Sequence, residues 1–470
     1  MDFDKAIYSR RVVTSKGIKE AIIFIENGKI MKIVTSNEEL ILLGYKTKSD
    51  SNNLDCFVPR HDNYGDSVIM PGLIDAHVHI NEPGREDWEG FDTATRAAAA
   101  GGITSLIEMP LNASPVTTTV AAFEQKIAAT QGKLHVNCGF YGGLVPHNYA
   151  DLPDLMRSGV FGIKCFLTHS GIDEFPNVSE ADLKKAMPLI AASGLPLLVH
   201  AELDAPHTKQ VFFQKNPTSY LAYLKSRPKT WENRAIKMML RLCEATKCRT
   251  HIVHLSSADL VSTLKNAKKH LPLTVETTPQ YLCFSAEEIP DAMTVFKCAP
   301  PIRERANNDK LWAALRDGTL DFIASDHSPA PPALKEIASG NLAKAWGGIS
   351  GLQFTLPVVW TAAQERGFSI EDMARLLSEN PAKFLGLAHK GRIEKGCDAD
   401  LVIWNPEADC MIEEENIHHR HKITPYLSEN SARLLRGQVM QTYVNGEKVF
   451  DNGAFVSLKK GQVLLNSMEH

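Results

Sequence analysis

The sequence lacks the features that mark several classes of protein. Its longest apolar runs, such as residues 195–201, are far too short to cross a bilayer. The formal net charge is -4 and no long run carries charge of one sign, so the charge pattern does not indicate a nucleic acid or an anionic membrane as a partner. No Gly-x-Gly-x-x-Gly follows the first apolar run of the middle region, so a dinucleotide-binding site has no support.

Signals for export and for disulfide bonding are also missing. Residues 1–5 lack the basic start of a secretory signal, and residues 466–470 do not carry a Ser-Lys-Leu peroxisomal address. The nine cysteines are scattered, odd in number and free of Cys-x-x-Cys pairs. This usage favours reduced thiols over a disulfide framework, and it argues against zinc held by cysteines. We therefore expect a cytoplasmic protein, with an organelle as the alternative.

What is present is the composition of a globular protein. The chain has 470 residues, of which 44% are hydrophobic and 23% charged, enough for one large domain and a smaller one. Near each end an Asn-Gly pair, Asn27-Gly28 and Asn445-Gly446, joins two apolar runs, which predicts two β-hairpins. Two β-rich ends around one long middle indicate a small β domain built from both termini. The predicted division is residues 1–68, 69–388 and 389–470.

The middle region alternates short apolar runs with helical stretches. Strands that alternate with helices predict parallel β/α units, and this number of runs predicts a (β/α)8 barrel of the α/β class. A doubly wound open sheet is the alternative. The runs are residues 73–79, 104–109, 136–140, 162–166, 197–200, 252–255, 273–277 and 321–325.

The first of these runs ends in a His-x-His pair. On a strand, His77 and His79 point to the same face, so two imidazoles at one strand end can hold one metal ion. Taken alone, such a pair is more often two ordinary histidines in a polar turn. The question is therefore whether the other runs supply partners.

Four later runs carry chemically active side chains. Lys164 lies within its run, and the other three, His200, His254 and Asp326, lie at the ends of theirs. Each has an ordinary explanation taken singly: a lysine that reaches the surface, a histidine that donates to a carbonyl, an aspartate that caps a helix. In barrels of this kind, however, functional groups gather at the carboxyl ends of the strands. That so many metal-binding side chains fall there by chance is improbable. Imidazoles and a carboxylate suit zinc or a similar divalent metal.

Lys164 requires separate chemistry, because an ammonium cannot bind a cation. A desolvated lysine can lose its proton, and the free amine can add carbon dioxide to form a carbamate that bridges two metals. Two divalent ions with this carbamate, Asp326 and a hydroxide leave one positive charge, which favours an oxyanion in the transition state. Paired metals activate water and polarise a carbonyl, while Asp326 can pass the proton to a leaving nitrogen. This chemistry hydrolyses an amide-like bond.

The residues resemble those of the amidohydrolase superfamily, and within it the cyclic amidohydrolases. The resemblance extends over nearly the whole chain and implies a (β/α)8 barrel with a small β-sandwich built from both termini. It implies two divalent ions such as Zn2+, bridged by carboxylated Lys164, and a homo-oligomer, since relatives are commonly tetramers. The implied metal ligands are His77, His79, Lys164, His200, His254 and Asp326.

Several segments are similar to those of the allantoinases, a group that opens the hydantoin ring of allantoin to give allantoate in purine catabolism. Hydrolysis of this small molecule is what the resemblance implies. The alternatives are a dihydropyrimidinase, hydantoinase or dihydroorotase type of cyclic amidohydrolase and, less favoured, a metal-free scaffold of the same fold. The segments are residues 77–85, 88–91, 108–112, 142–146, 297–303, 325–329 and 344–349.

Asn81 bears on the choice of substrate. Dihydroorotases usually have an arginine here, which holds the carboxylate of their substrate, whereas an amide can donate to and accept from a neutral ureido group. Asn81 is also a suitable turn residue before Glu82-Pro83-Gly84. The resemblance further implies contacts to substrate from Asn112 and from the backbone around Ala299 and Ser328, with ordinary loop structure as an equal alternative.

Two positions depart from the family pattern. Gln280 stands where relatives often have histidine and Ala330 where they often have cysteine, which affects hydrogen bonding near the pocket rather than the metal chemistry. Three further histidines, His418, His419 and His421, predict a solvated loop outside the barrel. His251 lies three residues before His254, so on a strand it faces the other way and is interpreted as structural.

Overall fold

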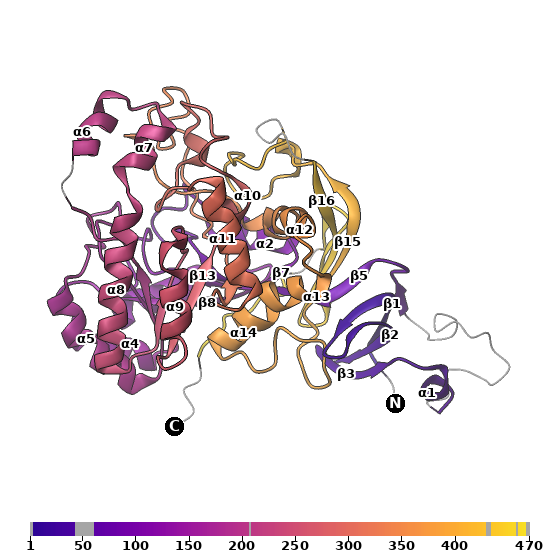
Figure 1. The fold of residues 1–470 in the computed structure, drawn as a ribbon. Coiled ribbons are helices and arrows are strands. Elements are labelled where there is room, and N and C mark those ends of the chain that lie inside the picture. The colour runs from indigo at the N-terminus through magenta and orange to yellow at the C-terminus, as the bar shows by residue number, and fades with distance from the viewer. Residues whose placement is uncertain (1–2, 43–60, 206–207, 429–433, 457–458, 467–470) are drawn as a thin grey trace.

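The computed structural model describes residues 3–42, 61–205, 208–428, 434–456 and 459–466. It consists of a barrel of parallel strands and a sheet built from both ends of the chain (Figure 1). The eight described cysteines form no disulfide, and Cys56 lies outside the described residues. Within the described ranges, none of the helices combines the length and apolarity that crossing a membrane requires.

Within the described residues, eight parallel strands follow one another around the barrel, and each matches one predicted run to within a few residues. The first and last strands close the ring, because Val78 bridges His327 and the His79 amide donates to the His327 carbonyl over 2.8 Å. The predicted (β/α)8 barrel is confirmed and the open sheet is excluded. The strands are β6 (Leu73–Val78), β7 (Ile103–Glu108), β8 (Asn137–Phe140) continued by β9 (Gly142–Gly143), β10 (Ile163–Phe166), β11 (Leu197–His200), β12 (Thr250–Ile252), β13 (Leu273–Thr277) and β14 (Phe322–Ile323).

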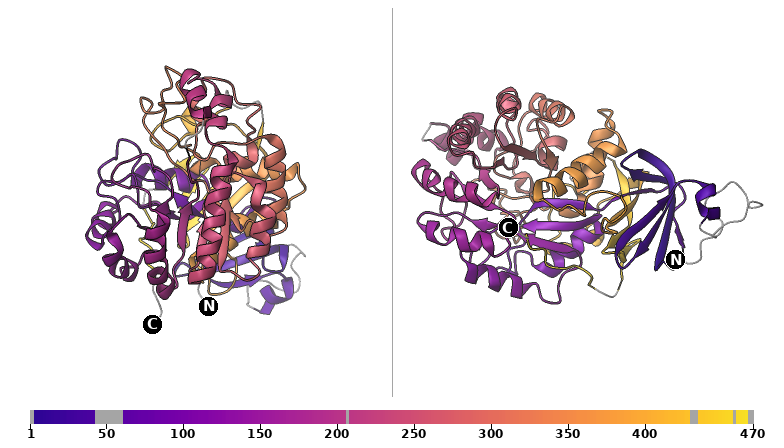
Figure 2. Two further views of the ribbon diagram at one scale, coloured as in Figure 1. Left: turned by 60° about the vertical axis from the view of Figure 1, so that its left-hand side comes forward. Right: turned by 90° about the horizontal axis from the view of Figure 1, so that it is seen from below.

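The barrel strands are buried on both faces, which explains why they read as continuous apolar runs rather than as alternating patterns. Helices cover their outside, as Figures 1 and 2 show. These are α2 (Phe91–Ala100), α3 (Val120–Ala129), α4 (Leu152–Arg157), α5 (Glu180–Ser193), α8 (Lys229–Thr246), α9 (Val261–Ala267), α11 (Arg305–Arg316), α12 (Thr355–Gln364), α13 (Ile370–Ala374) and α14 (Asn380–Leu385).

Three short helices lie beyond the carboxyl ends of the strands instead. α6 (Thr208–Lys215) and α7 (Tyr220–Ser226) interrupt the connection from β11 to β12, and α10 (Pro279–Cys283) follows β13. In Figure 1, α6 and α7 stand at the top of the molecule. The long excursion after β11 therefore builds a wall at the end of the barrel where the predicted functional residues lie.

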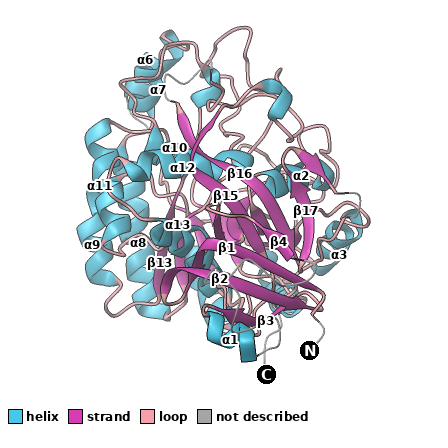
Figure 3. Ribbon diagram, turned by 90° about the vertical axis from the view of Figure 1, so that its right-hand side faces the viewer, coloured by secondary structure: helices cyan, strands magenta, loops and turns pink. Residues whose placement is uncertain are grey.

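A nine-stranded sheet in the described chain joins the two termini, and Figure 3 shows it facing the viewer. β5 makes the junction, because it pairs with β1 in parallel and with β15 in antiparallel fashion. Apart from the short helix α1 (Asn37–Leu42), the elements here are β1 (Lys5–Thr14), β2 (Gly17–Glu26), β3 (Lys29–Val34), β4 (His61–Asn63), β5 (Val68–Pro71), β15 (Leu401–Cys410), β16 (Leu435–Val444), β17 (Glu447–Asp451) and β18 (Ala454–Phe455).

The first half of strand β15 is buried on both faces and links the sheet to the barrel. Val402 and Trp404 belong to the hydrophobic core that also fills the barrel wall. The alternate residues Leu401 and Ile403 belong to a second core, shared with Ile7 of β1. The N-terminal and C-terminal halves thus pack together as the predicted sandwich, and the sandwich packs on the barrel.

Both predicted Asn-Gly hairpins are confirmed. Asn27 and Asn445 have φ of 51°, and the glycines after them have φ of 73° and 78°, as tight two-residue turns require. The two turns meet, because the Ala399 amide donates to the Gly28 carbonyl and the Gly446 amide donates to the Ala399 carbonyl. Turns from opposite ends of the chain thereby fix the terminal sheet, while the exact domain limits stay a prediction.

Candidate active site

Three of the predicted ligands meet where the barrel closes. His77 lies near the end of β6, His79 follows that strand, and Asp326 follows β14. Nε2 of His77 lies 3.2 Å from Oδ1 of Asp326, and Nε2 of His79 lies 3.4 Å from the same oxygen. The ligand atoms of all three lie within 4.8 Å of one another. Topology thus joins residues from the first and the last strand.

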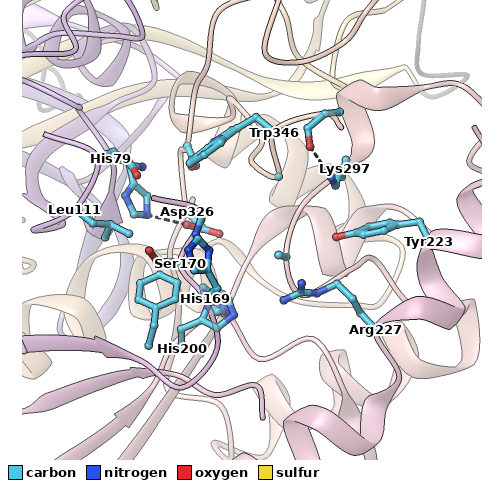
Figure 4. Close-up of a pocket in the computed structure, with 18 of the residues that line it drawn as sticks. His79, Leu111, His169, Ser170, His200, Tyr223, Arg227, Lys297, Asp326 and Trp346 are labelled. Atoms are coloured by element: carbon cyan, nitrogen blue, oxygen red, sulfur yellow. Dashed lines mark hydrogen bonds and ion pairs between the residues drawn. The ribbon is translucent and has the colours of Figure 1, made fainter. Parts of the chain in front are cut away.

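The remaining predicted ligands lie beside this group. His200 ends β11 and His254 follows β12, and Nδ1 of His200 lies 3.0 Å from Nε2 of His254. The His254 ring centroid is 5.4 Å from that of His77, which connects the two groups. Lys164 of β10 lines the same cavity. The structure therefore brings all six predicted ligands together, and Figure 4 shows three of them: His79, His200 and Asp326.

The donor set around His77 fits a divalent cation. Nδ1 of His77 lies 2.5 Å from the buried carboxylate of Glu276, so the ring proton belongs on Nδ1 and the Nε2 lone pair faces Asp326. Two acceptors this close repel each other unless a cation lies between them. Burial lowers the pKa of His79 to about 4, so the ring of His79 is neutral. Imidazole nitrogens with a carboxylate oxygen are ligands that zinc prefers.

Lys164 fits the carbamate hypothesis. Its side chain is completely buried, and its Nζ has no hydrogen-bond partner. Burial lowers the pKa of the Lys164 ammonium to about 8. A buried amine without a partner costs free energy, and conversion to a carbamate would supply it with oxygens that cations can hold. The pKa of Asp326 lies below its ordinary value, although burial alone would raise it.

The backbone at the site is strained. His254 has φ of 38° and Asp326 has φ of 48°, while Asn81 and Asn112 have φ of 68° and 69°. Residues other than glycine seldom adopt the left-handed region, and such strain clusters at functional sites. The strand ends therefore turn sharply exactly where the ligands are presented, a feature that the sequence pattern did not predict.

Two buried carboxylates that the sequence reasoning missed support the histidines from behind. Oε2 of Glu202 lies 2.8 Å from Nε2 of His200, and Nε of Arg227 donates to Glu202 over 3.2 Å. Glu276 contacts His77 in the same way. Although burial raises a carboxyl pKa, Arg227 and His200 bring that of Glu202 to about 2, and His77 and His251 hold that of Glu276 well below its ordinary value. Both carboxylates are therefore ionised.

His251 also corrects a prediction. It was expected to face away from the site, yet its Nε2 lies 3.1 Å from Oε2 of Glu276, whose other oxygen contacts His77. The ring is completely buried. The available signal was Glu276 itself, a charged residue inside the apolar run 273–277. A buried carboxylate requires donors, and histidines on neighbouring strands are suitable ones.

A cavity of about 570 Å³ opens over the ligands. As Figure 4 shows, His79, His200 and Asp326 lie on one side of it, and Tyr223, Arg227 and Lys297 lie opposite. Other residues that line it include Leu111, Asn112, Phe166, His169, Ser170, Ala299, Ser328 and Trp346.

The predicted substrate contacts divide into two groups. Asn112, Ala299 and Ser328 line the cavity as expected. Asn81 does not line it: the side chain is fully buried and its Nδ2 donates to the Pro329 carbonyl over 3.4 Å. A direct contact from Asn81 to substrate stays a prediction.

Comparison with known proteins agrees with this geometry. Residues 68–449 match the sequence profile of the Amidohydrolase family. The chain belongs to the amidohydrolase family. It is 42% identical to the allantoinase of Arabidopsis thaliana, over 98% of this chain and 90% of that protein, and 42% identical to the allantoinase of Streptomyces avermitilis, over 98% and 99%. The L-hydantoinase (dihydropyrimidinase) from Arthrobacter aurescens superposes with a TM-score of 0.87 at 30% identity, covering 99% of this chain and 100% of that one.

The two departures from the family pattern lie near the cavity of this amidohydrolase but not on its lining. Oε1 of Gln280, on α10, accepts from the Tyr426 hydroxyl over 3.4 Å. Ala330 is buried. Within the described residues, neither has a hydrogen bond or ion pair to the six ligands.

The histidines near residue 420 correct another prediction for this amidohydrolase. The expected solvated loop is wrong for His419, which is completely buried with its ring centroid 5.6 Å from that of His327. Burial lowers the pKa of His419 to about 3, so the ring is neutral. His421 contacts the Asp87 carbonyl through Nε2 over 2.7 Å. The segment therefore packs against the connection that follows β6 instead of standing in solvent.

One buried lysine ties together the loops on the far side of the cavity in this amidohydrolase. Nζ of Lys335 donates to the carbonyls of Lys297, Trp346 and Gly348 over 3.3, 3.1 and 2.8 Å. Gly348 also packs against Ser328, where an added Cβ would lie 2.3 Å from the Ser328 carbonyl oxygen. Glycine is therefore required at this close approach, and the loops form one connected wall.

Proposed function

We propose that this amidohydrolase hydrolyses the ring amide of allantoin to give allantoate. The observation that carries the proposal is the convergence of the six predicted ligands on a single cavity. The allantoinases of Arabidopsis thaliana and Streptomyces avermitilis, each 42% identical over 98% of this chain, support the choice of substrate. A neutral hydantoin ring with a ureido substituent is a small, polar molecule of the kind that such a cavity can enclose.

Two divalent cations such as Zn2+ are proposed to occupy the site, bridged by carboxylated Lys164. In the carboxylation, the lone pair of the neutral Nζ amine would form a bond to the carbon of carbon dioxide while one C=O π pair moves to oxygen. The nitrogen would then release one proton to solvent, which leaves a carbamate. His77, His79 and Asp326 would hold one side of the pair, and His200 and His254 the other. Bound cations of this kind lower the pKa of water and polarise a carbonyl.

The residues of the chain supply positioning and proton transfer. Asp326 is ionised and lies beside His77 and His79, so its carboxylate can accept the proton of the attacking water and then deliver it to the departing ring nitrogen. Asn112 and the backbone at Ala299 and Ser328 line the cavity and are proposed to hold the ring. Asn81 is proposed to contact the substrate directly, or to hold the cavity wall in place through its hydrogen bond to the Pro329 carbonyl.

A hydantoinase or dihydropyrimidinase activity is the second candidate. Its support is the 30% identity and TM-score of 0.87 with the L-hydantoinase from Arthrobacter aurescens. The test is turnover of allantoin, hydantoin, dihydrouracil and dihydroorotate by the purified protein, each with and without a chelator. We expect allantoin to give the highest kcat/KM, and the chelator to abolish it. No activity on allantoin would contradict the proposal, and chelator-insensitive activity would contradict the metal chemistry.

We also propose a homo-oligomer, such as a tetramer, in the cytoplasm. The free thiols of the eight described cysteines support a reducing compartment. A relative from Aquarana catesbeiana, 45% identical over 81% of this chain, is described as mitochondrial, which makes an organelle the alternative. Light scattering on the purified protein tests the oligomeric state, and fractionation of cells that express the tagged full chain tests the location.

A further inference from the structure

The carboxylate of Glu276 is the centre of a buried network beneath the metal ligands. The side chain comes from β13 and is completely buried. Its Oε1 lies 2.5 Å from Nδ1 of His77 and accepts from the backbone amide of His254 over 3.3 Å. Its Oε2 lies 3.1 Å from Nε2 of His251. One carboxylate therefore contacts two of the six ligand residues and a third histidine.

His251 is itself held firmly. Its Nδ1 lies 2.8 Å from the Thr274 hydroxyl oxygen. Its ring is stacked on Phe322, with centroids 5.3 Å apart and an angle of 7°, and packs on Phe384 at 4.3 Å. Because aromatic rings pack on its faces and polar groups contact both of its nitrogens, the imidazole is held in a single orientation. The network thus runs from Thr274 through His251 and Glu276 to His77.

The chemistry of these groups fixes where the protons lie. An ionised carboxylate only accepts, so Nδ1 of His77 and Nε2 of His251 must both carry hydrogen. Nδ1 of His251 is then an acceptor, which the Thr274 hydroxyl satisfies. His77 is left with a lone pair on Nε2, and that atom faces Asp326. Every polar group in the network has a matching partner, and the one lone pair left over points at the candidate metal position.

We propose that Glu276 and His251 are positioning residues that fix the tautomer and the orientation of His77 before any metal binds. A metal then meets a ring whose Nε2 is already aimed at the candidate metal position, and it does not have to select one of two tautomers. His200 is supported differently, because the carboxylate behind it, Glu202, is tied to Arg227 on the cavity wall. The inference rests on the metal-dependent function proposed above.

The direct test is the Glu276→Gln variant in the full-length protein. The neutral amide is a weaker acceptor than the carboxylate, and it has only one accepting oxygen for the two histidines. The tautomer and orientation of His77 are therefore held less firmly. We expect Zn2+ affinity to fall by about 10- to 100-fold, measured by competition with a chelator. The matched control is Glu232→Gln, which alters another buried carboxylate, one that pairs with Arg303 and accepts from the amides of Ser256 and Ser257 but contacts no ligand side chain. The control should keep the metal affinity of the wild type.

A gentler variant keeps the inference testable if Glu276→Gln does not fold. Thr274→Val preserves the shape of the side chain and removes only the hydroxyl that satisfies His251, so it should weaken Zn2+ binding by less than Glu276→Gln does. If Glu276→Gln folds and its Zn2+ affinity is unchanged, the inference is overturned. If Glu276→Gln does not fold, an unchanged Zn2+ affinity in Thr274→Val overturns it. An equal loss in Glu232→Gln would overturn it as well. A wild-type protein that binds Zn2+ but leaves allantoin intact would refute only the proposed substrate.

Discussion

The carboxyl end of the barrel and the terminal sheet are built on opposite principles. At the barrel end, polar groups are buried without partners: Nζ of Lys164 and Nδ1 of His79 and His254 make no hydrogen bond. In the terminal sheet, apolar segments such as the first half of β15 are packed on both faces, and the buried ammonium of Lys390 is paired with Asp398 and Asp400.

The backbone shows the same contrast. Left-handed residues in the terminal sheet sit in Asn-Gly turns, where this conformation is cheap, whereas at the barrel end it is imposed on His254 and Asp326. Unpaired polar groups and backbone strain both reduce stability. In the terminal sheet, Nε1 of Trp404 and Oε1 of Gln441 are also buried without a partner, but the buried charge of Lys390 is paired. At the barrel end the unpaired groups include the charged side chain of Lys164 and the predicted ligands, whose atoms stay free for a bound group. We therefore expect a substitution at the barrel end to lower activity more than stability, and a matched substitution in the sheet to lower stability more than activity.

The largest effect is expected from Lys164→Ala at the barrel end. Loss of the proposed bridging group should lower kcat by about 10³-fold or more, the scale on which removal of one electrostatic group slows catalysis, and should lower the metal content. Removal of an amine that has no partner should leave the melting temperature close to that of the wild type. A short carboxylic acid should restore part of the activity. Near-normal turnover without the acid would refute the bridging role.

The second prediction concerns the matched lysine of the sheet region. Lys390→Ala leaves the buried carboxylate of Asp400 without its cation, while Asp398 keeps its pair with Lys29. The loss should reduce the free energy of unfolding by about 3–5 kcal/mol. The specific activity of the folded protein should stay unchanged. Chemical denaturation and metal-loaded turnover measure the two quantities separately. A loss of kcat without a loss of stability would contradict the expectation that Lys390 contributes to stability and not to catalysis.

The smallest effect is expected where the two hairpin turns meet. Gly446→Ala introduces a side chain at φ of 78° and places Cβ 2.8 Å from the Gly28 backbone, so it should cost about 2 kcal/mol or more. Gly453→Ala is the control, because its φ of 89° is equally unfavourable but no atom lies within 4 Å, and it should cost about 1 kcal/mol. Denaturant unfolding of both variants checks the difference. Equal costs would show that the contact between the turns adds no constraint.

Much of this arrangement could be predicted from the sequence. The barrel strands are buried on both faces, so each appears as an apolar run that ends at a polar residue. Parallel topology brings such ends together, which is why His77, His200 and Asp326 could be assigned to one site although they are far apart in the chain. The two Asn-Gly hairpins follow from local backbone preference alone.

Other features could not be read from sequence, because they depend on distant partners. Glu276 contacts His77 across 199 positions, and nothing near either residue marks the pair. His419 reads as part of a polar histidine tract, yet it is buried beside His327. Asn81 lies next to the ligands along the chain, but its left-handed backbone accompanies a side chain that contacts Pro329 and not the cavity. Local sequence patterns indicate which residues are candidates for a site, whereas tertiary packing decides which way each side chain points and what it contacts.

The sequence by itself determined the order of strands, the six side chains at their ends and the family to which the chain belongs. These follow from burial, which sorts apolar from polar residues along each strand, and from a topology that admits few arrangements. Only the tertiary structure decided which nitrogen of His77 faces the candidate metal position, because that depends on Glu276 and His251 from other strands. The ring proton of His77 is confined to one nitrogen only when all the hydrogen-bonding partners in the network are in position.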